Sequence, residues 1–322
     1  MAHAIRIHEH GGPDVLRWEE VAVPDPGPRE VRIRQRAVGV NFIDVYQRSG
    51  LYPLPLPAIL GNEAAGVVDA VGPGVTDLKV GDRVAYGGLP GAYADARTMP
   101  ADRLVKLPDG IGDELAAAIM LKGMTAEYLL RRTHRVAPGE TVVFHAAAGG
   151  VGQIACQWAK ALGATVIGTV GSAAKVEVAR QHGCDHVLLT GPDLAARVRE
   201  LTRGIGAHVV YDGVGKDTWD ASLDSLRPRG MMVSFGNASG PVPAFQPLVL
   251  TMKGSLFLTR PSLVHYVATR EELVASAAAV FEVIRSGAVR VDVRHKYPLA
   301  EAARTHTDLE GRRTTGPVVL IP

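Results

Sequence analysis

The sequence has little of several features that define whole classes of protein. Its 322 residues include two cysteines, Cys156 and Cys184, which are too few for a disulfide framework or a four-thiolate zinc site. Aromatic residues make up 5% of the chain. No apolar run reaches the roughly 18 residues that a membrane-spanning helix needs. We therefore expect neither a disulfide-stapled module nor a membrane-spanning protein.

The chain also lacks an excess of charge of either sign. It has 35 Lys and Arg against 33 Asp and Glu, a net charge of +2, and its basic residues form no stripe. Because nucleic-acid binding usually needs a basic surface, we do not expect nucleic acid as a partner. Residues 1–6 resemble a strand and contain no signal-peptide core. We expect a cytoplasmic protein that does not bind membranes.

What is present indicates two globular domains. The length exceeds one ordinary hydrophobic core, and 47% of the residues are hydrophobic. Residues 1–110 contain short β-type runs separated by turns rich in Gly and Pro, which is typical of a compact, barrel-like β domain. From about residue 112 the hydrophobic period changes, so a domain of a different class follows.

Strands and helices alternate through the middle of the chain. We predict strands at 141–145, 164–170, 186–189, 207–211 and 230–235. Helices are predicted between them at 151–162, 173–182, 193–202 and 218–226, and elsewhere at 113–120, 125–133, 271–285 and 300–309. Such alternation predicts βαβ units and a parallel sheet, so the fold class is α/β.

A glycine-rich turn joins the first of these strands to its helix. After residues 141–145 comes Ala-x-Gly-x-x-Gly, counted from Ala147, with Gly149, Gly150, Val151 and Gly152 leading into the helix. Gly149 would let the backbone approach a pyrophosphate, and Gly152 would let the helix pack closely on the strand. The positive end of the helix dipole would face the phosphates. The strand–turn–helix context favours a dinucleotide site over an ordinary tight turn.

The end of the next strand distinguishes between the two nicotinamide cofactors. An NAD site usually has an Asp or Glu there, which binds the ribose 2′-hydroxyl. Here Gly171 and Ser172 follow the strand, Lys175 adds positive charge, and the first carboxylate is Glu177. This pattern favours NADPH over NADH. The alternative for Lys175 is a solvated lysine on the helix surface.

Together with these motifs, the β-rich half resembles the medium-chain dehydrogenase/reductase superfamily. In its zinc alcohol dehydrogenases a Gly-His-Glu motif supplies a zinc-binding histidine, but residues 61–63 read Gly-Asn-Glu, and Asn62 is a poor zinc ligand. The upstream cysteine has no counterpart in residues 38–41, and the four-cysteine lobe is missing. We expect no metal.

The closer resemblance is to the NADPH:quinone oxidoreductase, or zeta-crystallin-like, family, over nearly the full length. It is carried by NFIDVY (41–46), KGMTA (122–126), HAAAGGVG (145–152), SFGN (234–237) and GSLFLTRP (254–261). The resemblance implies a doubly wound Rossmann sheet plus a β-rich GroES-like barrel domain. The catalytic barrel domain would comprise 1–122 and 262–322, and the Rossmann domain would comprise 123–261.

The resemblance also implies roles for matching residues. Asn41 and Tyr46 would lie beside the nicotinamide and act as the catalytic residues. The other cofactor-binding positions would be Thr125, Tyr128, Gly149, Gly150, Val151, Gly152, Gly171, Ser172, Lys175, Phe235, Gly236, Asn237, Phe257, Leu258 and Arg312. The ordinary alternatives are a packing role for Tyr46, a strand-end role for Asn41 and helix capping by Arg312.

Two positions depart from bacterial members of the family. Those members often have a Tyr at the position of Thr190, where it helps to hold the 2′-phosphate, and a Ser at that of Gly213. Each change removes a possible hydrogen bond, and a charge-assisted one contributes about 1.5–3 kcal/mol. We expect a weaker preference for NADPH than is usual in the family, kept by Lys175 and Arg312.

The function that follows is NADPH-dependent reduction of a quinone-like acceptor, with Asn41 or Tyr46 donating a hydrogen bond to the developing oxyanion. One alternative is reduction of activated C=C bonds in enones or enoyl thioesters. Another, from a different class, is a cofactor-binding structural or RNA-binding protein. The resemblance further implies a homodimer that pairs the 254–259 strands of two copies.

Overall fold

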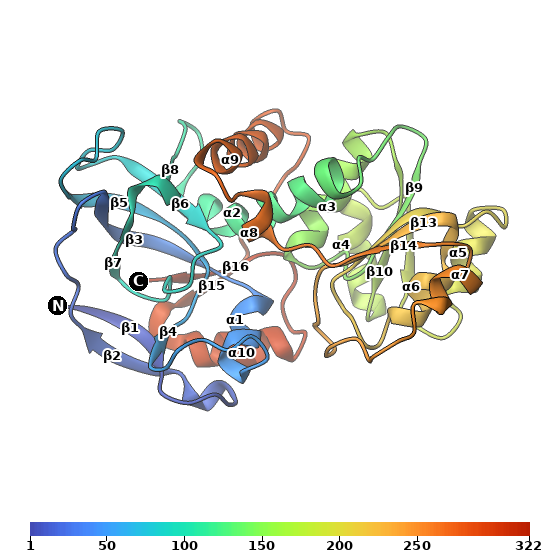
Figure 1. Cartoon of the computed structure of the whole chain (residues 1–322), viewed down its shortest axis with the longest axis horizontal. Coiled ribbons are helices and arrows are strands. Elements are labelled where there is room, and N and C mark those ends of the chain that lie inside the picture. Colours follow the sequence, from blue (N-terminus) through green and yellow to red (C-terminus); the bar gives the residue numbers. More distant parts are fainter. The chain divides into compact units, whose positions relative to one another are not determined.

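The computed structural model describes residues 1–322, which form two compact units (Figure 1). Unit 1 comprises Met1–Met124, Val267–Glu282 and Val291–Pro322, and unit 2 comprises Thr125–Tyr266 and Val283–Arg290. The chain passes between the units at four points: within helices α2 (Asp113–Tyr128) and α9 (Arg270–Arg285), after Tyr266 and after Arg290.

Unit 1 is built on two sheets. The larger sheet has the strand order β15-β16-β3-β5-β6-β8, and β7 pairs with β3 outside this order. Its strands are β3 (Glu30–Val40), β5 (Glu63–Val71), β6 (Arg83–Gly87), β7 (Ala96–Pro100), β8 (Val105–Lys106), β15 (His295–Pro298) and β16 (Val318–Ile321). The smaller sheet joins β2 (Arg17–Val21), β1 (Ala2–Ile7) and β4 (Ala58–Ile59). Short strands with turns between them confirm the prediction of a β-rich half.

Few helices accompany these sheets, and two of them matter for the site. They are α1 (Phe42–Ser49), which follows β3, and α10 (Ala302–Glu310), which precedes β16; single turns occur at Pro13–Val15, Ala101–Arg103 and Leu299–Glu301. The core between the sheets is formed by alternating residues of the strands, such as Ile5 and Ile7 on β1 and Val31 and Ile33 on β3. All four side chains are buried, as the period of two in each strand requires.

Unit 2 contains a six-stranded sheet with the order β11-β10-β9-β12-β13-β14. Every neighbouring pair is parallel. The strands are β9 (Thr141–Phe144), β10 (Thr165–Val170), β11 (His186–Leu189), β12 (Ala207–Asp212), β13 (Leu226–Ser234) and β14 (Phe257–Thr259). Numbered along the chain, this is the order 3-2-1-4-5-6 of a doubly wound dinucleotide-binding fold. The predicted parallel sheet is therefore confirmed.

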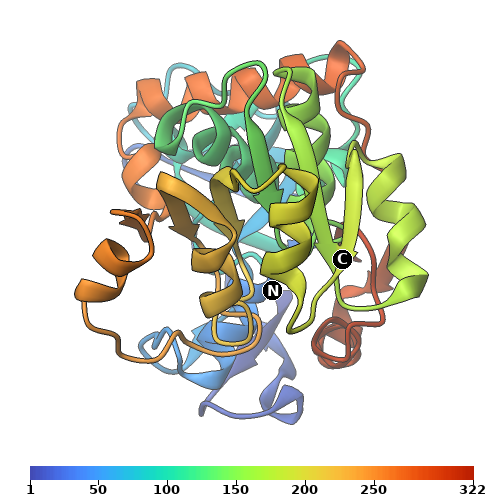
Figure 2. The ribbon, with the colours of Figure 1, turned by 90° about the vertical axis from the view of Figure 1, so that its right-hand side faces the viewer.

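Helices link the parallel strands of unit 2. They are α3 (Gly150–Ala161), α4 (Val176–Gln181), α5 (Leu194–Leu201), α6 (Trp219–Asp224) and α7 (Leu248–Met252); α8 (Leu263–Tyr266) follows β14, and Leu129–Thr133 forms a π-helical turn after α2. Because such crossovers are right-handed, α3 and α4 cover one face, and α5 and α6 cover the other. Figure 2 shows α5 (yellow) and α6 (gold) on the near side of the strands. Among the helices of the whole chain, none combines the length and apolar character needed to cross a membrane.

Candidate active site

The glycine turn of unit 2 leads from β9 directly into α3, as predicted. The turn is tight: the Gly149 N–H donates to the carbonyl of Ala146 (2.8 Å), and Ala146 itself has a positive φ of 53°. A Cβ on Gly152 would lie 2.5 Å from the Ala146 oxygen and 2.7 Å from the Ala147 Cα. Only glycine fits there, because both obstacles are backbone atoms that cannot move aside.

The first turn of α3 provides an anion site. Gly149 is the N-cap residue, and no acidic residue lies in the first turn. The first helical N–H that donates to the carbonyl oxygen of Gly149 is that of Gln153 (2.9 Å). The N–H groups of Gly150, Val151 and Gly152 therefore have no partner within the helix, and they meet the positive end of its dipole. These residues fit a pyrophosphate group.

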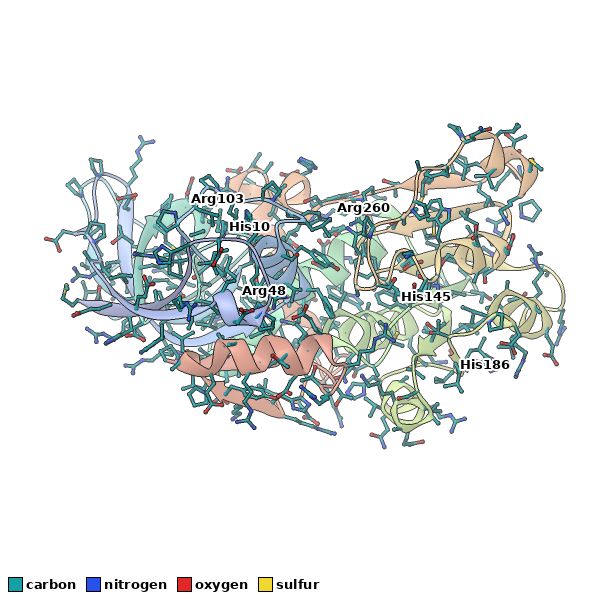
Figure 3. The ribbon with its side chains drawn as sticks, turned by 90° about the horizontal axis from the view of Figure 1, so that it is seen from below. His10, Arg48, Arg103, His145, His186 and Arg260 are labelled. Atoms are coloured by element: carbon teal, nitrogen blue, oxygen red, sulfur yellow. The ribbon has the colours of Figure 1, made fainter.

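A buried polar cluster supports the sheet edge beside this turn. Asp212, at the end of β12, accepts hydrogen bonds from the Ser222 hydroxyl (2.7 Å) and from two N–H groups of the next loop. Ser222 in turn accepts from Nε2 of His145 (2.9 Å), so Nδ1 accepts from the Thr169 hydroxyl (2.9 Å). Burial lowers the pKa of His145. His145, labelled in Figure 3, is thus a neutral structural residue.

The end of β10 forms the second part of the predicted cofactor site. Gly171 and Ser172 are exposed, and Lys175 ends a single helical turn that begins at Ala173. The Thr190 N–H donates to the carbonyl of Val170 (3.0 Å), so the departure at Thr190 lies beside the same strand end. Strand β10 and this corner contain no carboxylate. The corner therefore suits a 2′-phosphate better than a bare ribose hydroxyl.

The end of β13 brings Phe235, Gly236 and Asn237 to the same edge of the sheet. The N–H groups of Phe235 and Gly236 donate to the Asp212 carbonyl (2.7 and 3.3 Å). A Cβ on Gly236 would lie 2.4 Å from the Gly213 oxygen, and one on Gly213 would lie 2.9 Å from the Phe235 ring. The missing side chain at Gly213, noted above as a lost hydrogen bond, thus leaves space for the Phe235 ring.

Arg260, also labelled in Figure 3, was not predicted as a site residue. Its guanidinium donates to the Ser234 hydroxyl (3.1 Å) and to the Gly236 carbonyl (3.0 Å). It therefore fixes the loop that follows β13. The signal that could have identified it is its place in the GSLFLTRP segment, one residue before the end.

The remaining predicted residues of unit 2 are more dispersed. Tyr128 is buried and its ring stacks on Tyr266, with centroids 4.5 Å apart. Thr125 is half-buried in the last turn of the same helix. On edge strand β14, Leu258 packs against the core, whereas Phe257 is 58% exposed. The roles of these four residues at the cofactor stay predictions.

In unit 1, Asn41 caps helix α1 and is fixed by its neighbours. Asn41 and Asp44 form a capping box, in which the Asn41 N–H donates to the Asp44 carboxylate (2.8 Å). The Asn41 side-chain amide donates to Oε1 of Glu63 (2.8 Å), which also accepts from the ammonium of Lys122. Glu63 and Lys122 are both buried. Asn41 therefore has a structural role at the end of β3 and the start of α1, as its predicted alternative proposed.

Tyr46 lies one turn further along α1 within an aromatic cluster. Its ring centroid is 6.2 Å from that of Phe42 and 5.2 Å from that of Tyr52. Tyr52 is 37% exposed, and its N–H donates to the Tyr46 carbonyl (3.0 Å). Sequence reasoning did not identify Tyr52; the spacing of Tyr46 and Tyr52 across Gly50, a left-handed C-cap with φ of 83°, could have indicated it.

Arg312 lies in unit 1, at a left-handed position (φ 56°) just after α10, whereas Lys175 lies in unit 2. The structure thus groups Lys175 with Gly171 and Ser172 and places Arg312 on a different unit. The role of Arg312 at the 2′-phosphate stays a prediction.

Comparisons with known proteins agree with the fold of both halves of the chain. The family profile described as "Alcohol dehydrogenase GroES-like domain" matches residues 27–109, and that described as "Zinc-binding dehydrogenase" matches residues 150–278. A "Quinone oxidoreductase" of Pseudomonas aeruginosa is 55% identical, with 100% of both chains covered. The chain belongs to the quinone oxidoreductase family. The predicted Rossmann and GroES-like fold class is thereby confirmed.

Two further members extend the picture of this quinone oxidoreductase family. The crystal structure of the Escherichia coli quinone oxidoreductase complexed with NADPH superposes with a TM-score of 0.98 at 51% identity, covering 100% of both chains. A "2-haloacrylate reductase" of Burkholderia sp. is 48% identical and covers 100% of this chain and 99% of its own. The first supports the predicted cofactor, and the second shows that the wider family includes a reductase of another substrate.

The name of the second profile raises the question of zinc, and the residues present do not fit it. No group of three or more His, Cys, Asp or Glu side chains is placed to hold a metal. Asn62 uses its amide nitrogen to donate to Asp44 (2.7 Å) and Gln47 (2.7 Å). The neighbouring Glu63 is already neutralised by Lys122. In this member of the quinone oxidoreductase family, Asn62 and Glu63 are thus engaged by protein partners, among them a buried ammonium.

Proposed function

We propose that the chain is an NADPH:quinone oxidoreductase that works without a metal ion. The observation that carries the proposal is the anion site at the start of α3, next to a strand end that has a lysine and no carboxylate. The similarity to the Pseudomonas and Escherichia coli quinone oxidoreductases supports both the cofactor and the substrate class. We place the protein in the cytoplasm, as its sequence suggested.

Apart from the two predicted catalytic residues, the predicted cofactor residues, all but Arg312 in unit 2, would hold the cofactor as follows. The N–H groups of residues 150–152 bind the pyrophosphate; Gly171, Ser172 and Lys175 hold the 2′-phosphate, with Arg312 as a further cation. The rest of the cofactor is lined by Phe235, Gly236 and Asn237, together with Thr125, Tyr128, Phe257 and Leu258. We propose residues 123–261 as the dinucleotide domain and 1–122 with 262–322 as the catalytic domain; the compact unit 2 begins at Thr125 and also includes residues 262–266 and 283–290.

Bound NADPH supplies the hydride for the reaction. The chain's own contribution is to orient the acceptor and to stabilise the negative charge that develops on its oxygen. Tyr46 has a hydroxyl for this purpose, and Asn41 has a second amide N–H beyond the one given to Glu63. The rings of Phe42, Tyr46 and Tyr52, whose neighbouring planes are inclined by 40° and 70°, offer aromatic edges and faces against which a quinone ring can pack. A proton from water completes the hydroquinone.

Reduction of activated C=C bonds is the second candidate function. It is favoured by the 48% identity to the 2-haloacrylate reductase, whose name describes an acrylate substrate. The same cofactor site and the same oxyanion contact would serve both reactions. A comparison of acceptors separates them, as described in the Discussion.

The exposed edge of unit 2 supports the proposal of a homodimer. Strand β14 ends the sheet, and large apolar side chains lie exposed on it and on α7: Phe257 (58% exposed), Leu248 (60%) and Met252 (79%). Pairing of two β14 strands would satisfy the open backbone groups and cover these side chains. Light scattering should give the mass of two chains, and a monomer at micromolar concentration would exclude this arrangement.

Replacing Lys175 by alanine should weaken NADPH binding and leave NADH binding nearly unchanged. In the proposed site the lysine contacts the 2′-phosphate, which NADH lacks, and one charge-assisted bond of about 1.5–3 kcal/mol corresponds to about 10- to 100-fold in affinity. Fluorescence titration with each cofactor measures the ratio. Arg180→Ala is the matched control, because Arg180 is an exposed cation on the following helix. Equal losses for both cofactors would remove Lys175 from the 2′-phosphate site.

A further inference from the structure

Helix α1, which carries Asn41 at its start and Tyr46 in its middle, is held at both ends by one chain of buried hydrogen bonds. At its C-terminal end, the Arg48 guanidinium binds both carboxylate oxygens of Glu310 (2.8 and 2.9 Å) and contacts Nδ1 of His306 (3.1 Å). Both partners lie on α10, and Figure 3 shows Arg48 beside that helix. The Arg48 side chain is 3% exposed.

The direction of this chain follows from its donors. A guanidinium can only donate, so Nδ1 of His306 accepts from Arg48. Burial, with Arg48 as a second cause, lowers the pKa of His306 to about 3, so the ring is neutral and carries its hydrogen on Nε2. Nε2 therefore donates to the Tyr93 hydroxyl oxygen (3.0 Å), and Tyr93 gives its own hydrogen to Oδ2 of Asp44 (2.9 Å).

Asp44 closes the chain at the N-terminal end of α1. Besides Tyr93, its carboxylate accepts from the Asn41 N–H (2.8 Å) and from the Asn62 amide (2.7 Å). Burial raises the pKa of Asp44 to about 6, and these three hydrogen bonds and the charge of Lys122 act in the opposite direction. The other ionisable groups facing this cluster, Glu63, Arg48 and His306, come from β5, α1 and α10.

We propose that Arg48, His306, Tyr93 and Asp44 form a one-way hydrogen-bond chain that positions Asn41 and Tyr46 for reduction of the acceptor. None of the four is a catalytic residue. Each acts through the charge on Asp44, which holds the capping N–H of Asn41 and so sets where α1 begins. The catalytic consequence rests on the proposed function, whereas the ionisation of Asp44 does not.

Replacing Tyr93 by phenylalanine tests the chain at its midpoint. Asp44 must be ionised to hold α1, so kcat should fall as the pH decreases through its pKa. Loss of one donor favours the protonated carboxyl, so the acid limb of the kcat profile should move up by about one pH unit. The KM for NADPH should change little. Tyr86→Phe is the control, because Tyr86 is a fully buried tyrosine of unit 1 that donates to Gln35 instead (2.6 Å).

The same shift should be visible without cofactor or acceptor. The carboxyl carbon of Asp44, followed by ¹³C NMR in the cofactor-free protein, should titrate at higher pH in Tyr93→Phe than in the wild type or Tyr86→Phe. This readout separates the two proposals, since it is independent of which acceptor is reduced. An unmoved titration in Tyr93→Phe, or an equal shift in Tyr86→Phe, would overturn the chain.

His306 provides a second, rescuing pair of variants. In His306→Gln the side-chain oxygen can accept from Arg48 while the nitrogen donates to Tyr93, so the acid limb should stay near its wild-type position. In His306→Leu both bonds are lost, so Tyr93 no longer accepts a hydrogen bond and donates more weakly to Asp44; the limb should move upward, but by less than in Tyr93→Phe. If glutamine and leucine have the same effect, burial alone governs Asp44 and the directional chain is refuted.

Discussion

Replacing Gly152 by valine is expected to abolish NADPH binding. The new Cβ would lie 2.5 Å from the Ala146 oxygen and 2.7 Å from the Ala147 Cα, so β9 and α3 must separate or the turn must change shape. Overpacking of this kind costs about 1–3 kcal/mol and often more. A turn displaced at this point also turns the N–H groups of residues 150–152 away from the pyrophosphate. The Kd for NADPH should rise by at least about 100-fold.

The control variant is made at a glycine whose added Cβ would meet no neighbouring atom. Gly112 has a negative φ, and nothing lies within 4 Å of a Cβ built on it, so Gly112→Ala should bind NADPH as the wild type does. Fluorescence titration gives the two Kd values, and circular dichroism shows whether each variant is folded. A folded Gly152→Val protein with wild-type affinity would show that the glycine turn does not hold the cofactor.

Replacing Lys122 by methionine is expected to have the largest effect on stability. Its ammonium neutralises Glu63, which is fully buried and also holds Asn41 and the Leu121 N–H (2.7 Å). Removing one partner leaves a buried carboxylate without its countercharge, which costs about 3–5 kcal/mol. Urea unfolding should show this loss, with kcat reduced as well because Glu63, which holds Asn41, loses its own countercharge.

A surface ion pair in the same unit is the control for Lys122. Lys296 and Glu114 lie 2.5 Å apart with side chains 47% and 46% exposed, so Lys296→Met should cost less than about 1 kcal/mol. A double variant, Lys122→Met with Glu63→Gln, should recover part of the loss because the uncompensated charge is gone. Equal effects of the two lysine substitutions would contradict the account of the buried pair.

The doubly wound half of the fold was predictable because its signals are local. A strand, a glycine turn and a helix follow one another within residues 141–161, and each neighbour in the sheet is reached by one crossover. The predicted cofactor residues at 149–152, 171–175 and 235–237 lie at the ends of these strands, where any such fold binds its ligand. The period of the hydrophobic residues therefore indicated the fold, and the glycine turn indicated where the candidate site lies in it.

The polar framework of unit 1 could not be predicted in the same way. Tyr93 and His306 are separated by 213 residues in the sequence, and Arg48 and His306 by 258. No periodicity links such positions, since their contact depends on how β16 and α10 return to the first strands. The pairing of Lys122 with Glu63 is also long-range, although the substitution at Asn62 gave a hint that the site had changed its chemistry.

One helix boundary shows how tertiary packing overrides a local signal. We predicted helices at 113–120 and 125–133, with Lys122 and Gly123 between them. The structure has a continuous α2 from Asp113 to Tyr128 that runs on into a π-helical turn. Gly123 interrupts the pattern for a packing reason, because a Cβ there would lie 2.6 Å from a methyl group of Val280 on α9. The glycine permits the contact between the two helices and does not end α2.

The measurement that tests the central claim most directly is the rate of NADPH oxidation with a series of acceptors. Simple quinones, enones, 2-haloacrylates and enoyl thioesters should each be tested with NADPH and with NADH, followed by the loss of nicotinamide absorbance. We predict the highest kcat/KM for quinones with NADPH, in protein from which metals have been removed by chelation. Faster turnover of acrylates or enones, or a preference for NADH, would contradict the proposed function.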